Sequence, residues 1–330
     1  MNTRIGSRNP DLSVAWQPSA GFEALKKRAE LYARIRNFFA ERAVLEVETP
    51  LLCIAGVTDP SIEPLIVETS RSDSAPRYLQ TSPEYAMKRL LAQHRQPIFQ
   101  ISKAFRDGEA GKRHNPEFTL LEWYRPGLDD RALMDEVQEL LCLCVGERSR
   151  KDYSYRDLFI EHLELDPFTI QDTALERAAR ARLDVGDLSA DRNVWLDLLM
   201  THVIEPRLHS PGLCFIYDYP ASQAALAQVH EVGGVKMARR FECYLDGLEL
   251  ANGYLELKDV QEQRLRFEAD NMRRDQCGQQ QLPIDEHILA ALEYGLPTCS
   301  GVAMGLDRLL MLALGCDDIR QVVAFDWTRA

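Results

Sequence analysis

The chain has 330 residues, of which 45% are hydrophobic and 27% charged, and this globular composition excludes disordered and fibrous proteins. With 39 lysine and arginine residues against 51 aspartate and glutamate residues, the net charge is −12, so a protein that coats nucleic acid is not expected. Eight cysteines without metal-finger spacing, and no apolar run of membrane-span length, favour a soluble cytoplasmic protein with reduced thiols.

The first elements expected are an arm and a helix. Residues 1–18 are polar and carry two prolines, which indicates an N-terminal arm. From Ser19, a good N-cap residue, apolar residues recur every three or four positions and predict a helix to about Arg42. Alternation in residues 44–50 predicts a strand that Pro50 ends.

A second helix is expected after a strand at residues 78–80. Thr81 or Ser82 is placed to cap it, and its first turn contains Pro83 and Glu84. An acid in this position is explained equally well by the helix dipole or by a role in a binding site.

Two strands, residues 97–106 and 117–125, are predicted to flank a ten-residue loop. A period of two places Phe118, Leu120, Glu122 and Tyr124 on one face, and Arg106 on a face of the first strand. The loop carries three potential donors, Lys112, Arg113 and His114, which suit either a polyphosphate or solvation.

Residues 128–210 are expected to be mostly helical, as an insertion within a single domain that spans residues 19–330. A second β-rich block follows, in which Asp246-Gly247 predicts a tight hairpin. Glu249 and Glu256 flank Asn252-Gly253 and could hold Mg²⁺ or an ammonium group. Their opposite parity requires a bulge or a strand end near Asn252-Gly253 before both can face one ligand.

The last segments are two helices, residues 260–274 and 284–294, and a glycine-rich strand that enters a helix ended by Gly315. Gly301 and Gly305 permit close approach, and Arg308 lies in the first turn of that helix, where an anion could bind. The alternative is a packing contact with a surface arginine. The pattern of hairpins and flanking helices predicts an α+β fold with an antiparallel sheet.

In combination these segments resemble class II aminoacyl-tRNA synthetases. VLEVETP resembles motif 1, FRDGEAGKRHNPEFTLLEWY motif 2 and GVAMGLDR motif 3, and RHNPEFT, TSPEY and ELANGYLEL are similar to the lysyl branch. Motif 1 begins too early to leave room for an anticodon-binding domain. The chain therefore resembles the truncated paralogue family, the elongation factor P beta-lysine ligases. The segments SVAWQPSA and LEWYRP, and Ala303, are also similar to that family.

This resemblance implies a class II catalytic core, a six-stranded antiparallel sheet flanked by helices, that forms a homodimer through motif 1. It implies that ATP, with Mg²⁺, activates lysine or beta-lysine as an aminoacyl adenylate, which then acylates a lysine of elongation factor P. No tRNA and no membrane are expected as partners.

The resemblance also implies roles for individual residues. Arg106 and Arg308 would be catalytic, and Glu249 would be the candidate Mg²⁺ ligand. ATP would be bound by Arg106, Asp107, Gly108, Glu109, His114, Asn115, Phe118, Glu249, Leu250, Gly305 and Arg308. The amino acid would be bound by Ser82, Pro83, Glu84, Glu122, Tyr124, Asn252 and Glu256.

One position departs from the family pattern Arg-x-Glu: Arg106 is followed by Asp107 and Gly108, and the acid comes at Glu109. Either Glu109 or backbone groups would then contact the adenine edge. Two rival functions are a tRNA-charging enzyme without its anticodon domain and a non-catalytic regulator. The negative net charge argues against the first and the presence of both arginines against the second.

Overall fold

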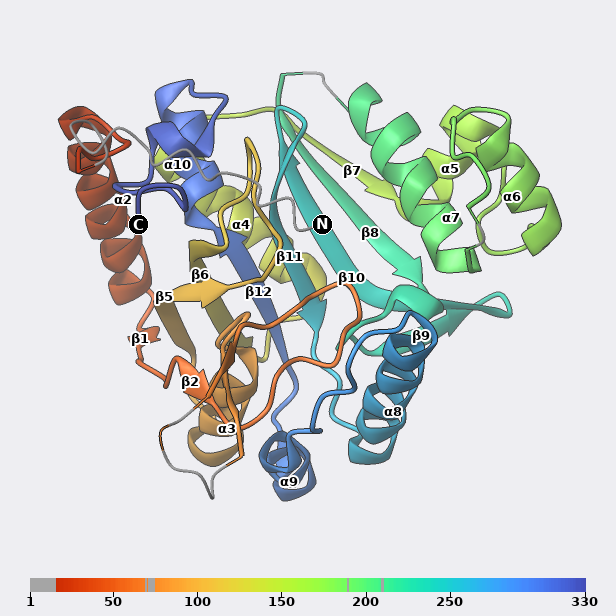
Figure 1. Ribbon diagram of the computed structural model, residues 1–330, viewed down its shortest axis with the longest axis horizontal. Helices are drawn as coiled ribbons and strands as arrows, with labels where there is room; N and C mark the ends of the chain where they lie inside the picture. Colours follow the sequence, from red (N-terminus) through yellow and green to blue (C-terminus); the bar gives the residue numbers. More distant parts are fainter. Residues whose placement is uncertain (1–15, 69, 71–74, 189, 209–210) are drawn as a thin grey trace, which may run out of the picture.

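The structure, a computed structural model, describes residues 16–68, 70, 75–188, 190–208 and 211–330. Apart from residues 16–18, the predicted N-terminal arm lies outside these ranges. Within them, nine strands form one large sheet, three short strands form a second, and helices lie on both faces of the large sheet (Figure 1). Of the helices that the structure describes, none combines the length and apolar composition needed to cross a membrane.

The helices are α2 (Phe22–Glu41), α3 (Glu84–His94), α4 (Asp130–Val145), α5 (Tyr155–Leu163), α6 (Asp172–Arg180), α7 (Arg192–Leu199), α8 (Val260–Gln276), α9 (Glu286–Gly295) and α10 (Leu306–Leu314). A π-helical turn, Met200–Ile204, continues α7, and single 3₁₀ turns lie at Glu205–Arg207, Ala221–Gln223 and Ile319–Gln321. The strands are β1 (Leu45–Glu46), β2 (Leu52–Cys53), β3 (Ile66–Val67), β4 (Arg77–Leu79), β5 (Ile98–Phe105), β6 (Glu117–Pro126), β7 (Arg150–Ser154), β8 (Leu213–Pro220), β9 (Val229–Val232), β10 (Val235–Leu245), β11 (Leu248–Leu255) and β12 (Cys299–Gly305).

The centre of the large sheet is the predicted antiparallel core. Six strands follow the order β5-β6-β12-β11-β10-β8, and every neighbouring pair in this run is antiparallel. The prediction of six strands is too low for the whole sheet, since β1 and β7 add parallel edges and β9 pairs with β10. The Asp246-Gly247 hairpin is confirmed, because both residues have the positive φ, 50° and 75°, that a type I′ turn requires.

The start of α2 corrects one local prediction. Ser19 does not cap this helix: Gly21 is its N-cap residue, and the Ser19 hydroxyl donates to Asp326 Oδ2 at 2.6 Å. The carboxylate near the C-terminus therefore competes successfully for the hydroxyl group, and joins the two ends of the described chain.

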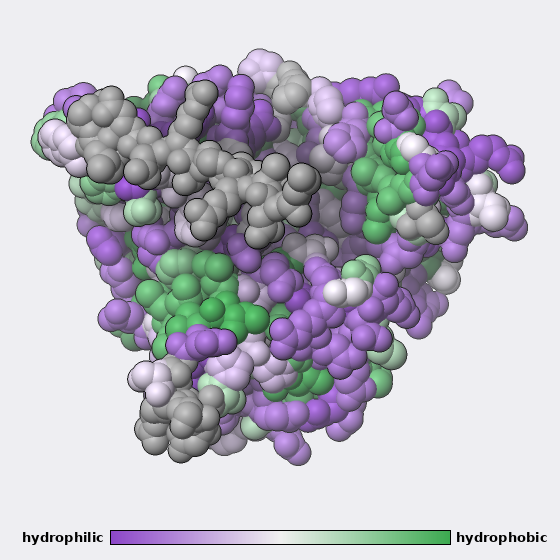
Figure 2. Space-filling model, viewed as in Figure 1, coloured by the Kyte–Doolittle hydropathy of each residue, from purple (hydrophilic) through white to green (hydrophobic). Residues whose placement is uncertain are grey.

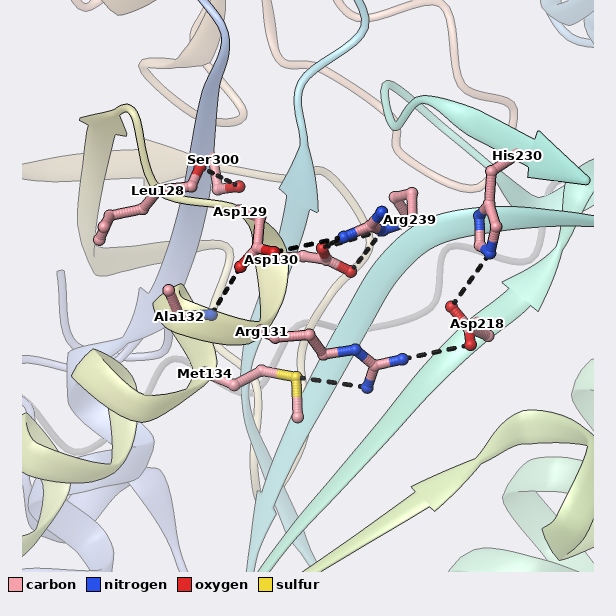
Figure 3. A network of polar contacts seen from close by, with 10 residues as sticks. All are labelled: Leu128, Asp129, Asp130, Arg131, Ala132, Met134, Asp218, His230, Arg239 and Ser300. Carbon is pink, nitrogen blue, oxygen red and sulfur yellow. Dashed lines mark hydrogen bonds and ion pairs between the residues drawn. The ribbon is translucent and has the colours of Figure 1, made fainter.

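One face of the sheet is closed by α2, α4 and α10 over a continuous apolar core. An ion-pair network fixes the start of α4 against the strands (Figure 3). Asp130 is fully buried, and Arg239 of β10 donates through Nε to both of its carboxylate oxygens, at 2.9 and 3.0 Å. Next to this pair, Arg131 donates to Asp218 of β8 at 3.2 Å. Because an unpaired buried carboxylate is costly, Arg239 stabilises this arrangement.

On the opposite face the helices leave the middle of the sheet uncovered. Helices α3 and α9 pack on one side, and α5, α6 and α7 pack over β8 and β10 on the other. The region 128–210, expected to be mostly helical, contributes α4 to α7 and also β7, a strand that was not predicted. Strands β6, β12 and β11 lie between the two groups of helices, and their polar side chains face a cavity.

Candidate active site

A cavity of about 260 Å³ lies over β6, β11 and β12. The start of α3, the loop between β5 and β6, the start of α10 and the apolar side chains of Val57 and Ile62 complete its walls. Three acidic residues, Glu84, Glu122 and Glu256, gather at one end. Arg106 and Arg308, each beside a glutamate, lie at the other, so the cavity has two chemically distinct ends.

A bulge in β11 brings the acidic residues onto one face. Tyr244 of β10 pairs with Glu249 and Cys243 pairs with Ala251, so Leu250 is the extra residue. Beyond it, Asn252 and Glu256 share the cavity side with Glu249. The expected irregularity is therefore present, although it lies at Leu250 and not at Asn252-Gly253.

Glu122 is a buried carboxylate at the acidic end. Its two oxygens accept hydrogen bonds from Ser82 Oγ at 2.8 Å and from Tyr124 OH at 2.7 Å. Burial, with repulsion from Glu84, raises the pKa of Glu122 to about 8. Ser82 also accepts from the Glu84 N–H at 3.0 Å, but Pro83 is the N-cap residue of α3, so the prediction that Thr81 or Ser82 caps this helix is wrong.

Glu256 and Glu84 meet around a lysine that sequence reasoning missed. Lys88 Nζ lies 2.6 Å from Glu84 Oε1 and 2.5 Å from Glu256 Oε2. Burial raises the pKa of Glu256 to about 7, while the charge of Lys88 opposes that shift. The only sequence signal for Lys88 was its position four residues after Glu84, which is also typical of a surface ion pair.

Gly301 of β12 permits two of these side chains to approach the sheet. A Cβ atom built on Gly301 would lie 2.3 Å from Tyr124 Cε1 and 2.4 Å from Glu256 Oε1. The glycine of the third motif thus shapes the acidic end.

The other end carries Arg106 and Arg308. The Arg106 guanidinium lies 5.1 Å from the centre of the Phe118 ring, and its NH1 is 3.6 Å from Glu109. Arg308 donates to the Glu249 carbonyl at 2.9 Å and lies 2.5 Å from His114 Nε2. Burial, together with Arg308, lowers the pKa of His114 below its usual value, so the neutral ring can accept from Arg308. These groups can contact a nucleotide base and its phosphates.

Most of the predicted site residues line this cavity: Ser82, Glu84, Arg106, Glu109, His114, Asn115, Phe118, Glu122, Tyr124, Glu249, Leu250, Asn252, Glu256, Gly305 and Arg308. Asn115 donates to the Glu117 carbonyl and accepts from the Trp327 N–H, so its amide is already engaged within the protein.

Three predicted residues are not part of its wall. Pro83 lines an adjoining cavity beside β2. Asp107 accepts from the Gly108 N–H at 2.9 Å and donates its own N–H to Glu63, while Gly108 has a φ of 75° with open space around it. The backbone turn at these two positions carries Glu109 into the wall. Tyr254 lines the cavity but was not predicted as a site residue. Its position two residues from both Asn252 and Glu256 places it on the same strand face, and this alternation could have identified it.

Comparison with known proteins gives a consistent result. The family model described as tRNA synthetases class II (D, K and N) matches residues 14–329. Proteins named "Elongation factor P--(R)-beta-lysine ligase" from Salmonella typhi and Pectobacterium atrosepticum are 48% and 47% identical over 324 residues, which cover 96% of this chain and 99% of each relative. The motifs, the antiparallel sheet and these matches agree, and the chain belongs to the class II tRNA synthetase family (D, K and N).

Proposed function

We propose that this protein is a ligase that uses ATP to activate lysine or beta-lysine and transfers the aminoacyl group to a lysine of elongation factor P. The observation that carries the proposal is one cavity with arginines at one end and three buried or half-buried carboxylates at the other. The names of its relatives supply the acceptor protein.

In the first step, a carboxylate oxygen of the amino acid attacks the α-phosphorus of ATP, and the bond to the bridging oxygen breaks to release pyrophosphate. In the second, the acceptor ε-amine attacks the carbonyl carbon, its nitrogen loses a proton, and AMP leaves with the C–O bonding electrons. Neither step needs a protein nucleophile, so positioning and charge neutralisation are sufficient.

At the nucleotide end, Arg106 and Arg308 are placed to neutralise charge on the α-phosphate. Phe118, next to Arg106, offers a ring face on which adenine can stack. Glu109, Leu250 and Gly305 line the same end, and Glu109 is the acid available near Arg106 for the adenine edge.

Glu249 fits a Mg²⁺ ion at this end. In the described part of the chain no cluster of three or more metal-binding side chains is present. A Mg²⁺ site does not require such a cluster, because Mg²⁺ commonly binds one or two carboxylates and takes its other ligands from phosphates and water. Glu249 lies next to Arg308, at 3.3 Å, and provides such an oxygen ligand. When bound, Mg²⁺ would neutralise phosphate charge.

At the acidic end, Glu84, Glu122 and Glu256 would bind the two ammonium groups of the amino acid. Tyr124, Asn252 and Ser82 line or brace the same space. Burying an ammonium without partners is costly, so several acids around one small ligand match a doubly aminated substrate.

A homodimer is part of the proposal. In the predicted stripe of α2, Ile35 and Phe39 are buried within their own chain, so they cannot form the interface. Exposed apolar side chains remain at Leu45, Leu52 and Ile54, and Figure 2 shows a hydrophobic patch where Figure 1 places β2 and the segments beside it. Such a patch favours association. A monomer mass in light scattering at micromolar concentration would contradict the proposed homodimer.

The acceptor is proposed to be protein rather than tRNA, in the cytoplasm. The net charge of −12 gives no broad positive field for tRNA. All eight cysteines are unpaired, in keeping with a reducing compartment.

The deciding experiment combines two assays. Lysine-dependent or beta-lysine-dependent pyrophosphate exchange measures activation, and mass spectrometry of elongation factor P measures transfer. We expect one aminoacyl mass on elongation factor P and none on tRNA. An acceptor in which the modified lysine is replaced by alanine should block transfer and leave exchange intact. Aminoacylated tRNA with unmodified elongation factor P would refute the proposal.

A further inference from the structure

Lys88 is a buried cation directly behind the acidic end of the cavity. Its side chain is 3% exposed, and it is absent from the cavity wall. The ammonium group lies between Glu84, one turn earlier on α3, and Glu256, which follows β11. Lys88 can therefore act on a bound molecule only through these two carboxylates.

The charges at this end match a particular class of ligand. Glu84, Glu122 and Glu256 supply three negative charges when ionised, and Lys88 cancels one of them. Within the described residues, no other lysine, arginine or histidine forms an ion pair with these acids. The remaining charge of −2 balances the two ammonium groups of an aminoacyl adenylate, whose amino-acid carboxylate has been consumed and whose phosphate charge would lie at the arginine end.

Lys88 also holds the two carboxylates in place, and its charge favours the ionised form of Glu256. Without it, repulsion and burial would favour protonation of Glu256, whose pKa burial already raises to about 7. A protonated Glu256 would bind an ammonium group less well. Four further ionisable groups lie beside this cluster, Tyr85, Tyr124, Tyr254 and Cys299, and burial raises the pKa of each; Lys258 lies near Cys299.

We propose that Lys88 is a positioning and specificity-determining residue: it aims Glu84 and Glu256 at the cavity and leaves the charge that selects amino acids with two ammonium groups. This inference rests on the proposed function, because it assumes that a diamino acid occupies the acidic end. It assigns no contact between Lys88 and the substrate.

The test is pyrophosphate exchange by the Lys88→Met variant, followed from about pH 6.5 to about pH 9, the range in which the raised carboxyl pKa values lie. Near neutral pH the lysine KM should rise about tenfold or more, as expected for a weakened charged hydrogen bond, with a much smaller change in kcat or in the ATP KM. The pH at which the lysine KM falls should rise by about one unit, because Glu256 loses its proton at a higher pH when Lys88 is absent. Selectivity for lysine over norleucine, which lacks the second ammonium, should decrease.

Two further variants make the result specific. Lys88→Arg keeps the charge, so its pH profile should stay at the wild-type position. Lys103→Met removes a half-exposed lysine on β5 that pairs with Glu117 at 3.2 Å, and it should behave as wild type.

A Lys88→Met variant with wild-type pH profile and selectivity would overturn the inference, even if KM rose. If that variant does not unfold cooperatively, Lys88→Arg decides: an unmoved profile supports the inference, and a shifted profile overturns it. Absence of lysine-dependent exchange in the wild-type protein would instead refute the proposed function.

Discussion

Replacing Gly301 by alanine tests the geometry of the acidic end. The new Cβ would lie 2.3 Å from Tyr124 Cε1 and 2.4 Å from Glu256 Oε1, so each neighbour must retreat by about 1 Å to reach ordinary contact. Both side chains are almost fully buried and have little space for that movement. Overpacking of this kind costs about 1–3 kcal/mol of unfolding free energy. That exceeds the gain of about 0.4–1 kcal/mol from restricting the unfolded chain.

The same displacement should weaken the amino-acid site, because Glu256 would leave its position beside Lys88. We expect the lysine KM to rise about tenfold, with the ATP KM nearly unchanged. Denaturant unfolding and pyrophosphate exchange measure the two effects. Gly21→Ala is the matched control for the lysine KM, which it should leave unchanged, since no atom lies within 4 Å of its added Cβ and its φ is −70°; its stability reports only the change of N-cap residue in α2. Wild-type stability and lysine KM in Gly301→Ala would refute the reasoning.

Four other outcomes are expected. Arg106→Ala or Arg308→Ala should lower pyrophosphate exchange by about 10² or more through loss of phosphate neutralisation, and unchanged exchange in both would contradict adenylation. Glu256→Gln should weaken lysine binding by about 1.5–3 kcal/mol in calorimetry while ATP binding persists, whereas equal loss of both would indicate a structural role. Arg239→Met should lower the free energy of unfolding by about 3–5 kcal/mol, because it leaves the buried Asp130 carboxylate unpaired. Adding Asp130→Leu should restore most of the lost stability, and a double variant no more stable than the single variant would contradict this account. Glu122 and Glu256 have folded-state pKa values of about 8 and about 7 against 4.5, so they retain protons that the unfolded chain releases. Without ligand, their contribution to the free energy of unfolding should therefore fall from about pH 4.5 and level off above about pH 8. Glu122→Gln should reduce that fall in denaturant unfolding measured across this pH range, and an unchanged pH dependence would disprove the account.

Sequence patterns predicted the parts of the molecule that are determined locally. The period of two in residues 117–125 placed Phe118, Glu122 and Tyr124 on the cavity face, where all three lie. The parity of Glu249 and Glu256 required an irregular strand, and the bulge at Leu250 supplies it. These features depend on backbone geometry within a few residues, so a short window of sequence contains them.

Other features depend on partners far away in the chain. Lys88 forms an ion pair with Glu256, which lies far from it in the sequence. The Ser19 hydroxyl donates to Asp326 and does not cap the helix. No local pattern distinguishes these residues from a surface lysine or a capping serine. The same reason explains why β7 was missed, because it is held at the sheet edge by pairing with β8.

The bulge at Leu250 makes segment length, rather than residue identity alone, a determinant of the chemistry of this site. Between Leu250 and Glu256 every side chain is assigned to core or cavity by counting from one unpaired residue. If Leu250 were instead paired as an ordinary strand residue, Glu249 and Asn252 would face opposite sides: either Glu249 would turn into the apolar layer beneath α10, or Asn252 and Glu256 would. Engineering of substrate preference on this strand can therefore proceed by substitution, whereas inserting or deleting one residue between Ala251 and Glu256 would turn the side chains beyond the change to the opposite face of the sheet.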